Sequence, residues 1–195
     1  MNLENNYWYF KKALSKPFVN RIIEICEESQ KKDAAIEGSV VDKKKRDCLI
    51  SWVSSETIYK ILNPYINTAN ENAGWNFNIS WNEDCQYTIY NKKQFYGYHI
   101  DSFIKPYKDC KNKNWEGKYR KLSLTLQLSD PSEYEGGDFY FKYLTSEGVK
   151  EEKVDDAKEL GTIIIFPSFV YHQVTPITKG TRKSLVNWSL GFPFK

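Results

Sequence analysis

The chain contains only two histidines, and each stands in a setting where it could bind a metal ion. His99 is followed two positions later by Asp101. On a β-strand, side chains two positions apart point to the same face, so His99 and Asp101 can reach one metal ion together. The second histidine, His172, ends a strand-like run of aromatic and aliphatic residues much later in the chain. Either histidine alone could be an ordinary structural residue, whereas their joint placement favours a metal site.

Two histidines and one carboxylate on facing strands form the facial triad that holds non-haem iron(II) in oxygenases. The triad covers one face of the metal and leaves positions open for a cosubstrate and dioxygen. His99, Asp101 and His172 are therefore candidate iron(II) ligands.

Arg182 follows the second histidine at the start of another strand-like run. Period-two alternation places Arg182, Ser184, Val186 and Trp188 on one face of that strand. Burial of an arginine side chain is costly in free energy unless a carboxylate or phosphate pairs with it. The planar guanidinium can bind a carboxylate through two parallel hydrogen bonds. The hydroxyl of Ser184 can add a further hydrogen bond to that carboxylate. A cosubstrate with one carboxylate on the metal and another on Arg182 would be held at both ends, and 2-oxoglutarate is such a molecule. A surface arginine on an edge strand is the alternative.

This combination of residues resembles the iron(II)/2-oxoglutarate-dependent dioxygenases, specifically their prolyl 4-hydroxylase-like branch. The segment from Tyr90 to Asp101 is similar to the family's Y-x-x-G-x-x-Y-x-x-H-x-D pattern, with Lys93 or Gln94 in place of the usual glycine. Three further segments are similar to parts of the family. Residues 122–139 resemble its strand followed by a Gly-Gly turn, and residues 160–172 resemble its approach to the distal histidine. Residues 46–52 resemble the chain that follows its mobile substrate loop. The resemblance covers most of residues 44–191.

The resemblance implies a double-stranded β-helix, or jelly-roll, core with N-terminal helices packed outside it. It implies that His99, Asp101 and His172 bind iron and that Arg182 pairs with the distal carboxylate of 2-oxoglutarate. It also implies cosubstrate contacts from Tyr90 and Gln127, and substrate contacts from Arg46, Arg120 and Trp188. For Tyr90, Gln127 and Trp188, packing within the protein is the alternative.

As a member of this family, the protein is expected to be an enzyme that uses iron(II), 2-oxoglutarate and dioxygen, with ascorbate as a further candidate cofactor. Our first hypothesis is a peptidyl-prolyl 4-hydroxylase-like enzyme, which couples decarboxylation of 2-oxoglutarate to C–H hydroxylation of a proline in a peptide or protein. Aromatic residues near the site suit a proline ring. A hydroxylase of a free amino acid or another small molecule is one alternative, and a non-catalytic jelly-roll binding module is another.

Hydrophobic periodicity predicts the elements that position these residues. Helices are expected over 17–32 and 56–72, and a short strand over 48–53. After Gly74 the pattern changes to short alternating runs that favour an antiparallel sandwich or barrel; these runs are 75–81, 84–91, 96–101, 121–129, 138–143, 149–154, 160–166, 169–175 and 182–190. The prediction is mainly β with N-terminal helices (α+β): one domain over 1–195, with a helical layer over about 1–74 and a jelly-roll core over about 75–195.

Composition and charge exclude several other classes. The formal net charge is +3, from 28 basic and 25 acidic residues, which does not favour a nucleic-acid partner. No apolar run reaches the roughly 18 residues of a membrane span, the N-terminus lacks the pattern of a secretory signal, and the four cysteines form no CxxC pair. We therefore expect a cytoplasmic monomer. The basic loop over 105–121 is either a solvated surface or, with the loop over 33–47 and its lysines, a rim for an acidic extended substrate.

Overall fold

The computed structural model describes residues 2–34 and 42–193, which form two α-helices and three antiparallel sheets. The largest sheet has eight strands in the order β1-β12-β8-β15-β6-β4-β2, with β5 paired to β15. Its strands are β1 (Trp8–Phe10), β2 (Lys32–Asp33), β4 (Leu49–Val53), β5 (Trp81–Asn82), β6 (Cys85–Tyr90), β8 (Tyr119–Gln127), β12 (Ile163–Pro167) and β15 (Arg182–Gly191).

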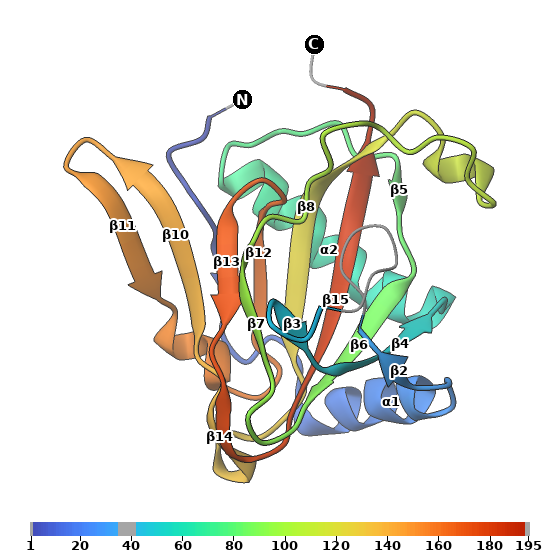
Figure 1. Cartoon of the computed structure of the whole chain (residues 1–195). Helices are drawn as coiled ribbons and strands as arrows, with labels where there is room; N and C mark the ends of the chain where they lie inside the picture. The colour runs from blue at the N-terminus through green and yellow to red at the C-terminus, as the bar shows by residue number, and fades with distance from the viewer. Residues whose placement is uncertain (1, 35–41, 194–195) are drawn as a thin grey trace.

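A smaller sheet of five strands lies in front of the large sheet, in the order β11-β10-β13-β7-β3 (Figure 1). Its strands are β3 (Arg46–Asp47), β7 (Phe95–His99), β10 (Phe139–Thr145), β11 (Gly148–Lys153) and β13 (Tyr171–Val174). A third sheet pairs β9 (Tyr134–Gly136) with β14 (Ile177–Gly180). Two antiparallel sheets facing each other make the jelly-roll architecture, so the predicted fold class is confirmed.

Alternation along the strands creates two separate hydrophobic cores. In β12, Ile163 and Ile165 face the helices, whereas Ile164 and Phe166 face the smaller sheet. Successive side chains of a strand point to opposite faces, so an apolar run such as this one marks a strand covered on both sides. The core between the sheets is the layer from which the candidate site opens.

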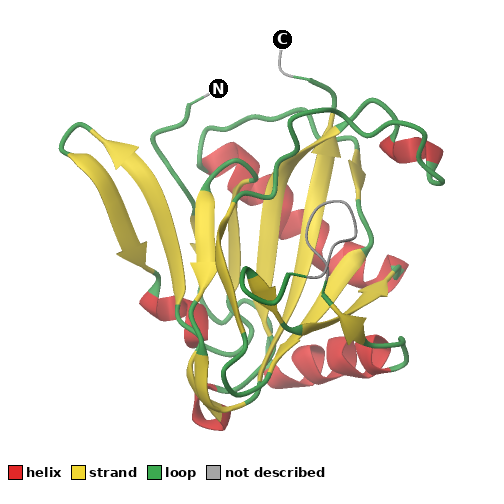
Figure 2. Ribbon diagram, in the orientation of Figure 1, coloured by secondary structure: helices red, strands yellow, loops and turns green. Residues whose placement is uncertain are grey.

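The two helices cover the outer face of the large sheet (Figure 2). Helix α1 (Lys16–Glu27) has a proline in its first turn and buries Val19, Ile22 and Cys26 at helical spacing. Helix α2 (Glu56–Asn72) begins after Ser55, whose side chain accepts a hydrogen bond from the amide of Ile58 at 3.4 Å. Neither helix has the length and apolar character that a membrane span needs.

The N-terminal part is less helical than predicted. The first helix ends at Glu27 instead of residue 32, and the region before Gly74 contributes the strands β1 to β4 to both main sheets. Short edge strands such as β1 carry too few residues to show an alternating pattern, so their pairing with a neighbouring strand decides their structure.

The strand predicted over 75–81 is wrong except at its last residue. Trp75 and Phe77 are buried, but the chain between them is irregular because Asn76 has a positive φ of 50°. The Asn70 side chain bonds both the amide and the carbonyl of Phe77, and so replaces a strand partner. The other predicted strands are confirmed, with shifts of a few residues at their ends.

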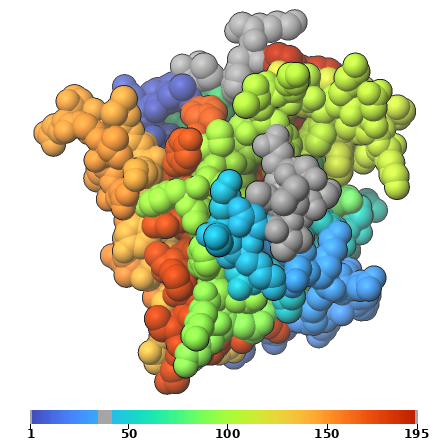
Figure 3. Space-filling model, in the orientation of Figure 1, coloured from blue at the N-terminus to red at the C-terminus, as the bar shows by residue number. Residues whose placement is uncertain are grey.

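Within the described part of the chain, three short 3₁₀ helices connect strands of the jelly roll: η2 (Lys113–Trp115), η3 (Pro131–Glu133) and η4 (Asp155–Lys158). The first lies within the predicted loop over 105–121, whose last three residues belong to β8. Of the loop predicted over 33–47, residues 35–41 lie outside the described residues. In the space-filling view the segment that contains β3 lies against the segment that contains β7 (Figure 3).

Candidate active site

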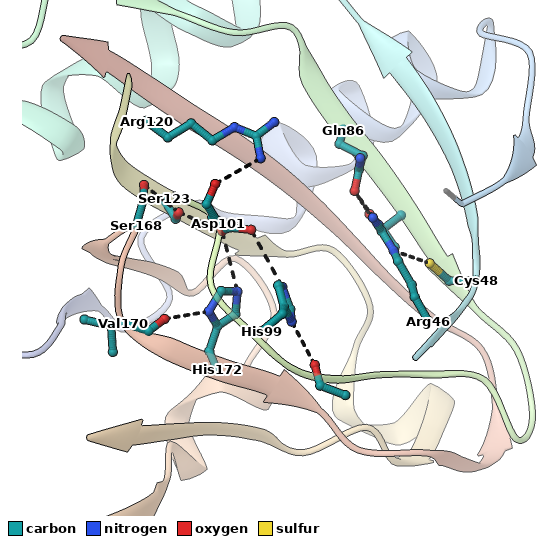
Figure 4. A network of polar contacts seen from close by, with 12 residues as sticks. Arg46, Cys48, Gln86, His99, Asp101, Arg120, Ser123, Ser168, Val170 and His172 are labelled. Atoms are coloured by element: carbon teal, nitrogen blue, oxygen red, sulfur yellow. Dashed lines mark hydrogen bonds and ion pairs between the residues drawn. The ribbon is translucent and has the colours of Figure 1, made fainter. Parts of the chain in front are cut away.

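The pairing of β7 with β13 brings the two histidines together. His172 and His99 are register partners, and the centres of their rings lie 4.1 Å apart. Asp101 follows β7, and its amide donates to the Ser168 carbonyl at 2.8 Å, which turns the carboxylate toward both imidazoles. Its Oδ1 lies 3.6 Å from His99 Nε2, and its Oδ2 lies 3.5 Å from His172 Nε2 (Figure 4). The ligand atoms of the three residues all lie within 4.8 Å of one another.

Backbone carbonyls orient both imidazole rings. His99 Nδ1 lies 2.8 Å from the Gly97 carbonyl, and His172 Nδ1 lies 3.0 Å from the Val170 carbonyl. A carbonyl oxygen can only accept, so each Nδ1 carries a proton, and in the neutral ring Nε2 is the nitrogen that offers a lone pair. Histidine ligands of metals are commonly held in this way. Both lone pairs face the carboxylate of Asp101.

Electrostatics keep these groups in the protonation states that bind metals. Burial, assisted by the nearby His172, lowers the pKa of His99 to about 3, so its ring is neutral at neutral pH. Burial alone would raise the pKa of Asp101, but His172, His99 and Arg120 outweigh it and lower that pKa to about 2. The Ser123 hydroxyl donates to Asp101 Oδ2 at 2.7 Å and further stabilises the carboxylate. The neutral imidazole of His99 and the ionised carboxylate of Asp101, with His172 beside them, fit a first-row divalent metal such as iron(II).

A cavity of about 370 Å³ opens beside the three residues. It is large enough for a small dicarboxylic acid and part of a further ligand. Besides the triad, its walls include aromatic, polar and arginine side chains: Arg46, Trp52, Gln86, Thr88, Tyr90, Tyr96, Phe103, Arg120, Thr125, Arg182, Ser184 and Trp188.

Arg182 lines this cavity as a buried cation. Its side chain is 2% exposed, and its hydrogen bond, from Nη1 to the Ser184 hydroxyl at 3.4 Å, goes to a neutral group. Its Nε has no hydrogen-bond partner among the described residues, and no carboxylate there lies within ion-pair distance. Gly137 makes room for it, because a Cβ at that position would lie 3.1 Å from Arg182 Cδ. A buried guanidinium that has no carboxylate partner among the described residues can bind an anion that enters the cavity.

The other residues predicted to contact the cosubstrate differ in position. Tyr90 is buried, lines the cavity, and pairs in register with Arg182 across β6 and β15. Gln127 is also buried but does not line the cavity. Its amide donates to the Tyr134 hydroxyl at 2.8 Å and to the Ser129 carbonyl at 3.3 Å.

Arg120 is tied to a residue that sequence reasoning missed. Glu83 is 1% exposed and accepts from Arg120 Nε at 2.6 Å and from Nη2 at 2.7 Å, while the Tyr107 hydroxyl donates to it at 2.8 Å. The Arg120 guanidinium also lies 3.8 Å from the ring centre of Trp188. Glu83 lies in the connection between β5 and β6 and belongs to no recognisable motif, so the sequence offered no signal for it.

Arg46 enters the cavity from β3. Its side chain is 6% exposed, and its guanidinium lies 4.4 Å from the ring centre of Tyr96. Nε donates to Cys48 Sγ at 3.2 Å, and Nη2 donates to the amide oxygen of Gln86 (Figure 4). The sequence singled out Arg46 but not Gln86, whose polar side chain on a strand is uninformative without its neighbours.

Comparison with known families identifies the chain's relatives. A family model described as the 2OG-Fe(II) oxygenase superfamily matches residues 85–190, which is more than half of the chain. The chain belongs to the 2OG-Fe(II) oxygenase superfamily. The matched range includes the three candidate metal ligands and Arg182, and the family's name specifies iron(II) and 2-oxoglutarate. The family prediction is therefore confirmed, and the family implies the predicted iron(II), 2-oxoglutarate and dioxygen.

Curated relatives of this superfamily member are PKHD-type hydroxylases. One from Alteromonas mediterranea is 34% identical over 100 residues, which cover 51% of this chain and 39% of the relative. Another from Synechococcus sp. strain CC9902 is 40% identical over 93 residues, which cover 48% of this chain and 35% of the relative. The chain thus matches about two fifths of the length of these curated relatives.

Solved structures share the fold over nearly the whole chain. A prolyl-4-hydroxylase of Pseudomonas putida matches with a TM-score of 0.72 and 19% identity, over 95% of this chain and 93% of its own. A prolyl hydroxylase of Trichoplax adhaerens, solved with a peptide fragment, matches with a TM-score of 0.66 and 16% identity, over 95% and 84% of the two chains. These similarities confirm the jelly-roll fold.

Proposed function

We propose that this oxygenase is a prolyl 4-hydroxylase-like enzyme that hydroxylates proline in a peptide or protein. One observation carries the proposal: two oriented imidazoles and a carboxylate share a cavity with the buried, unpaired guanidinium of Arg182. A metal ligand set and a carboxylate-binding residue in one cavity match the two ends of 2-oxoglutarate.

In this proposal His99, Asp101 and His172 hold the iron(II). Bound iron(II), with 2-oxoglutarate and dioxygen, supplies the oxidising chemistry that converts a C–H bond to C–OH. The carbonyls of Gly97 and Val170 keep the proton on each Nδ1 and thereby keep each Nε2 free for the metal. The Ser123 hydroxyl holds one oxygen of the Asp101 carboxylate and limits its rotation.

Arg182 and Ser184 bind the distal carboxylate of 2-oxoglutarate, and Tyr90 lies beside them. The Tyr90 ring centre is 5.7 Å from the Arg182 guanidinium, and the tyrosine shares their cavity. We assign Gln127 a supporting role through the Tyr134 hydroxyl, because it does not line the cavity. Burial of Arg182 strengthens its attraction for a bound carboxylate.

Aromatic walls support a proline-bearing substrate. Tyr96 stacks on His99 with ring centres 3.4 Å apart, and Trp188 lies across the cavity under the guanidinium of Arg120. Arg120 thus contributes by holding Trp188 in place. Aromatic side chains in the cavity wall beside the candidate metal ligands suit the pyrrolidine ring. Relatives named PKHD-type hydroxylases and structural neighbours named prolyl hydroxylases, one with a bound peptide, support the same substrate.

We further propose that the protein acts in the cytoplasm as a monomer of one domain and uses ascorbate to restore iron(II). Its four cysteines are free thiols, and three of them are buried, which agrees with a reducing compartment.

An anaerobic titration tests the cofactor part of the proposal. Iron(II) and then 2-oxoglutarate are added to the metal-free protein, and the weak visible charge-transfer band of a chelated 2-oxo acid is recorded. We expect the band only after both additions in the wild type and in Gln173→Ala, and no band in His172→Ala. Gln173 neighbours His172 on β13 but does not line the cavity. A band that persists in His172→Ala would contradict the assignment.

The substrate part is tested with a library of proline-containing peptides under dioxygen. We expect mass spectrometry to find one added oxygen atom on proline in a subset of the library, together with equimolar succinate. Oxygen added only to free amino acids, with no peptide modified, would overturn the peptide assignment.

A further inference from the structure

Arg46 is a buried cation whose described contacts are all with neutral groups. It donates to the Cys48 sulfur and to the Gln86 amide oxygen, and its guanidinium lies over the Tyr96 ring. Burial raises the pKa of the Cys48 thiol, which is therefore protonated at neutral pH. No carboxylate among the described residues lies within ion-pair distance of Arg46. A buried charge without a partner is costly, so its retention in a cavity wall needs an explanation.

The other charges of the cavity balance one another when the cofactors of the proposed function are bound. Arg120 is neutralised by Glu83 in a two-point ion pair. The positive charges of the divalent metal and Arg182 equal in number the negative charges of Asp101 and the two carboxylates of 2-oxoglutarate. Arg46 alone remains uncompensated, so the loaded cavity carries one excess positive charge. The next anionic group to enter would be attracted to Arg46.

The guanidinium of Arg46 is fixed close to the metal ligands. Arg46 and Tyr96 are register partners across β3 and β7, and the Gly97 amide donates to the Lys45 carbonyl at 2.9 Å. The guanidinium carbon is 4.4 Å from the Tyr96 ring centre, which is 3.4 Å from that of His99. The Arg46 guanidinium carbon therefore lies within about 8 Å of the His99 ring centre. Only a few bonds of substrate fit in that span.

Arg46 also keeps a free donor for such a group. Nε and Nη2 are used by Cys48 and Gln86, whereas Nη1 makes no hydrogen bond to any described residue. These two bonds hold the guanidinium plane, so little side-chain freedom is lost when an anion binds.

We propose that Arg46 binds a carboxylate of the substrate that lies a few bonds from the hydroxylated carbon. This inference rests on the proposed function and narrows its substrate class to acidic substrates. Two sources present the same chemistry: an acidic residue next to proline in a peptide, and the α-carboxylate of a free amino acid.

The test compares acids with their matched amides. Isothermal titration under anaerobic conditions measures binding of each probe to the protein loaded with iron(II) and 2-oxoglutarate. One arm uses capped peptides in which proline is followed by glutamate or by glutamine. The other arm uses L-proline and L-prolinamide. The arm that shows the preference identifies the source of the carboxylate.

We expect the wild type to bind the acid of one arm at least about tenfold more tightly than its amide, since a hydrogen bond to a charged group is typically worth that factor. In Arg46→Gln the affinity for the acid should fall to the affinity for its amide. Arg46→Lys should retain part of the preference for the acid. Arg21→Gln, the same change on the exposed face of α1, should leave the preference intact.

The outcomes separate this inference from the proposed function. If the charge-transfer band forms in the wild type but neither acid is preferred, the role of Arg46 is wrong and the cofactor site stands. A preference for the acid that persists in Arg46→Gln would also overturn the proposed role of Arg46. If Arg46→Gln instead abolishes 2-oxoglutarate binding, Arg46 serves the cosubstrate. If the band does not form in the wild type, the proposed function itself fails.

Discussion

His99 and His172 are directly opposite each other on neighbouring antiparallel strands, although most of the jelly roll separates them in sequence. Their ring centres lie 4.1 Å apart, and the register between the strands shifts just after this pair. A slip of one residue in β13 would turn His172 to the other face of the sheet. The candidate metal site therefore depends on the register of the β7–β13 pair.

Removal of the Asp101 carboxylate should strongly weaken metal binding. Outer partners of metal ligands typically contribute 10–100-fold to affinity, so we expect Asp101→Ala to weaken iron(II) or cobalt(II) binding by more than about 100-fold. Titration followed by visible absorption measures the affinity, and circular dichroism checks the fold. Asp155→Ala, at an exposed carboxylate, is the matched control. Wild-type affinity in Asp101→Ala would show that Asp101 is not a ligand.

Replacement of Arg182 should separate cosubstrate binding from metal binding. Arg182→Gln removes the buried guanidinium without touching the triad, so we expect the Kd of 2-oxoglutarate to rise about 100-fold while the Kd of the metal stays within about threefold. The charge-transfer band, titrated at saturating iron(II), reports the first constant. An unchanged Kd for 2-oxoglutarate would rule out the proposed ion pair.

The metal-free protein should lose stability as the pH falls below 6.5. The pKa of His99 is about 3 in the folded protein against 6.5 as its ordinary value, so the unfolded chain takes up the proton first. The free energy of unfolding should fall by about 2 kcal/mol between pH 6.5 and pH 5. Asp101, with a pKa of about 2 against 3.8, adds a loss in the same direction below pH 4.

Urea denaturation at a series of pH values measures this dependence. The variant His99→Gln serves as the comparison, because it lacks the titrating ring. We expect its free energy of unfolding to change less between pH 6.5 and pH 5. Equal slopes in both proteins would mean that His99 is not held neutral by burial.

The ion pair between Glu83 and Arg120 should be important for stability. Glu83→Gln leaves the Arg120 guanidinium without its two-point partner, which typically costs about 3–5 kcal/mol for a buried pair. Urea denaturation gives the change, and the double variant with Arg120→Met should recover part of it. A loss below about 1 kcal/mol would show that water or Asp101 compensates the freed charge.

Much of this fold was predictable from local patterns. The apolar stripe of α2 and the alternating runs of β6, β8 and β15 indicated a helical flank on an antiparallel β core. The elements that failed are those set by distant partners. The strand expected over 75–81 is irregular because the Asn70 side chain binds Phe77, and the strands β1 to β3 exist because a neighbouring edge was open.

The sequence by itself determined which residues could do the chemistry. Scarce histidines, an aspartate two positions after one of them, and an inward arginine are features of residue type and spacing, and those act over a few residues. They sufficed to single out His99, Asp101, His172 and Arg182 as a set. They also sufficed to name the family.

Only the tertiary structure decided how charge is distributed around that set. Arg46, Arg120 and Arg182 are the same residue type and look alike in the sequence. In the structure Glu83 forms an ion pair with Arg120, whereas no described carboxylate pairs with Arg46 or Arg182. The strength of an ion pair depends on distance and burial, and both follow from which strands become neighbours. The pairing of β3 with β7 places Arg46, and the pairing of β8 with β15 places Arg120. Strand pairing therefore determines which arginine is held in an ion pair and which can bind a ligand.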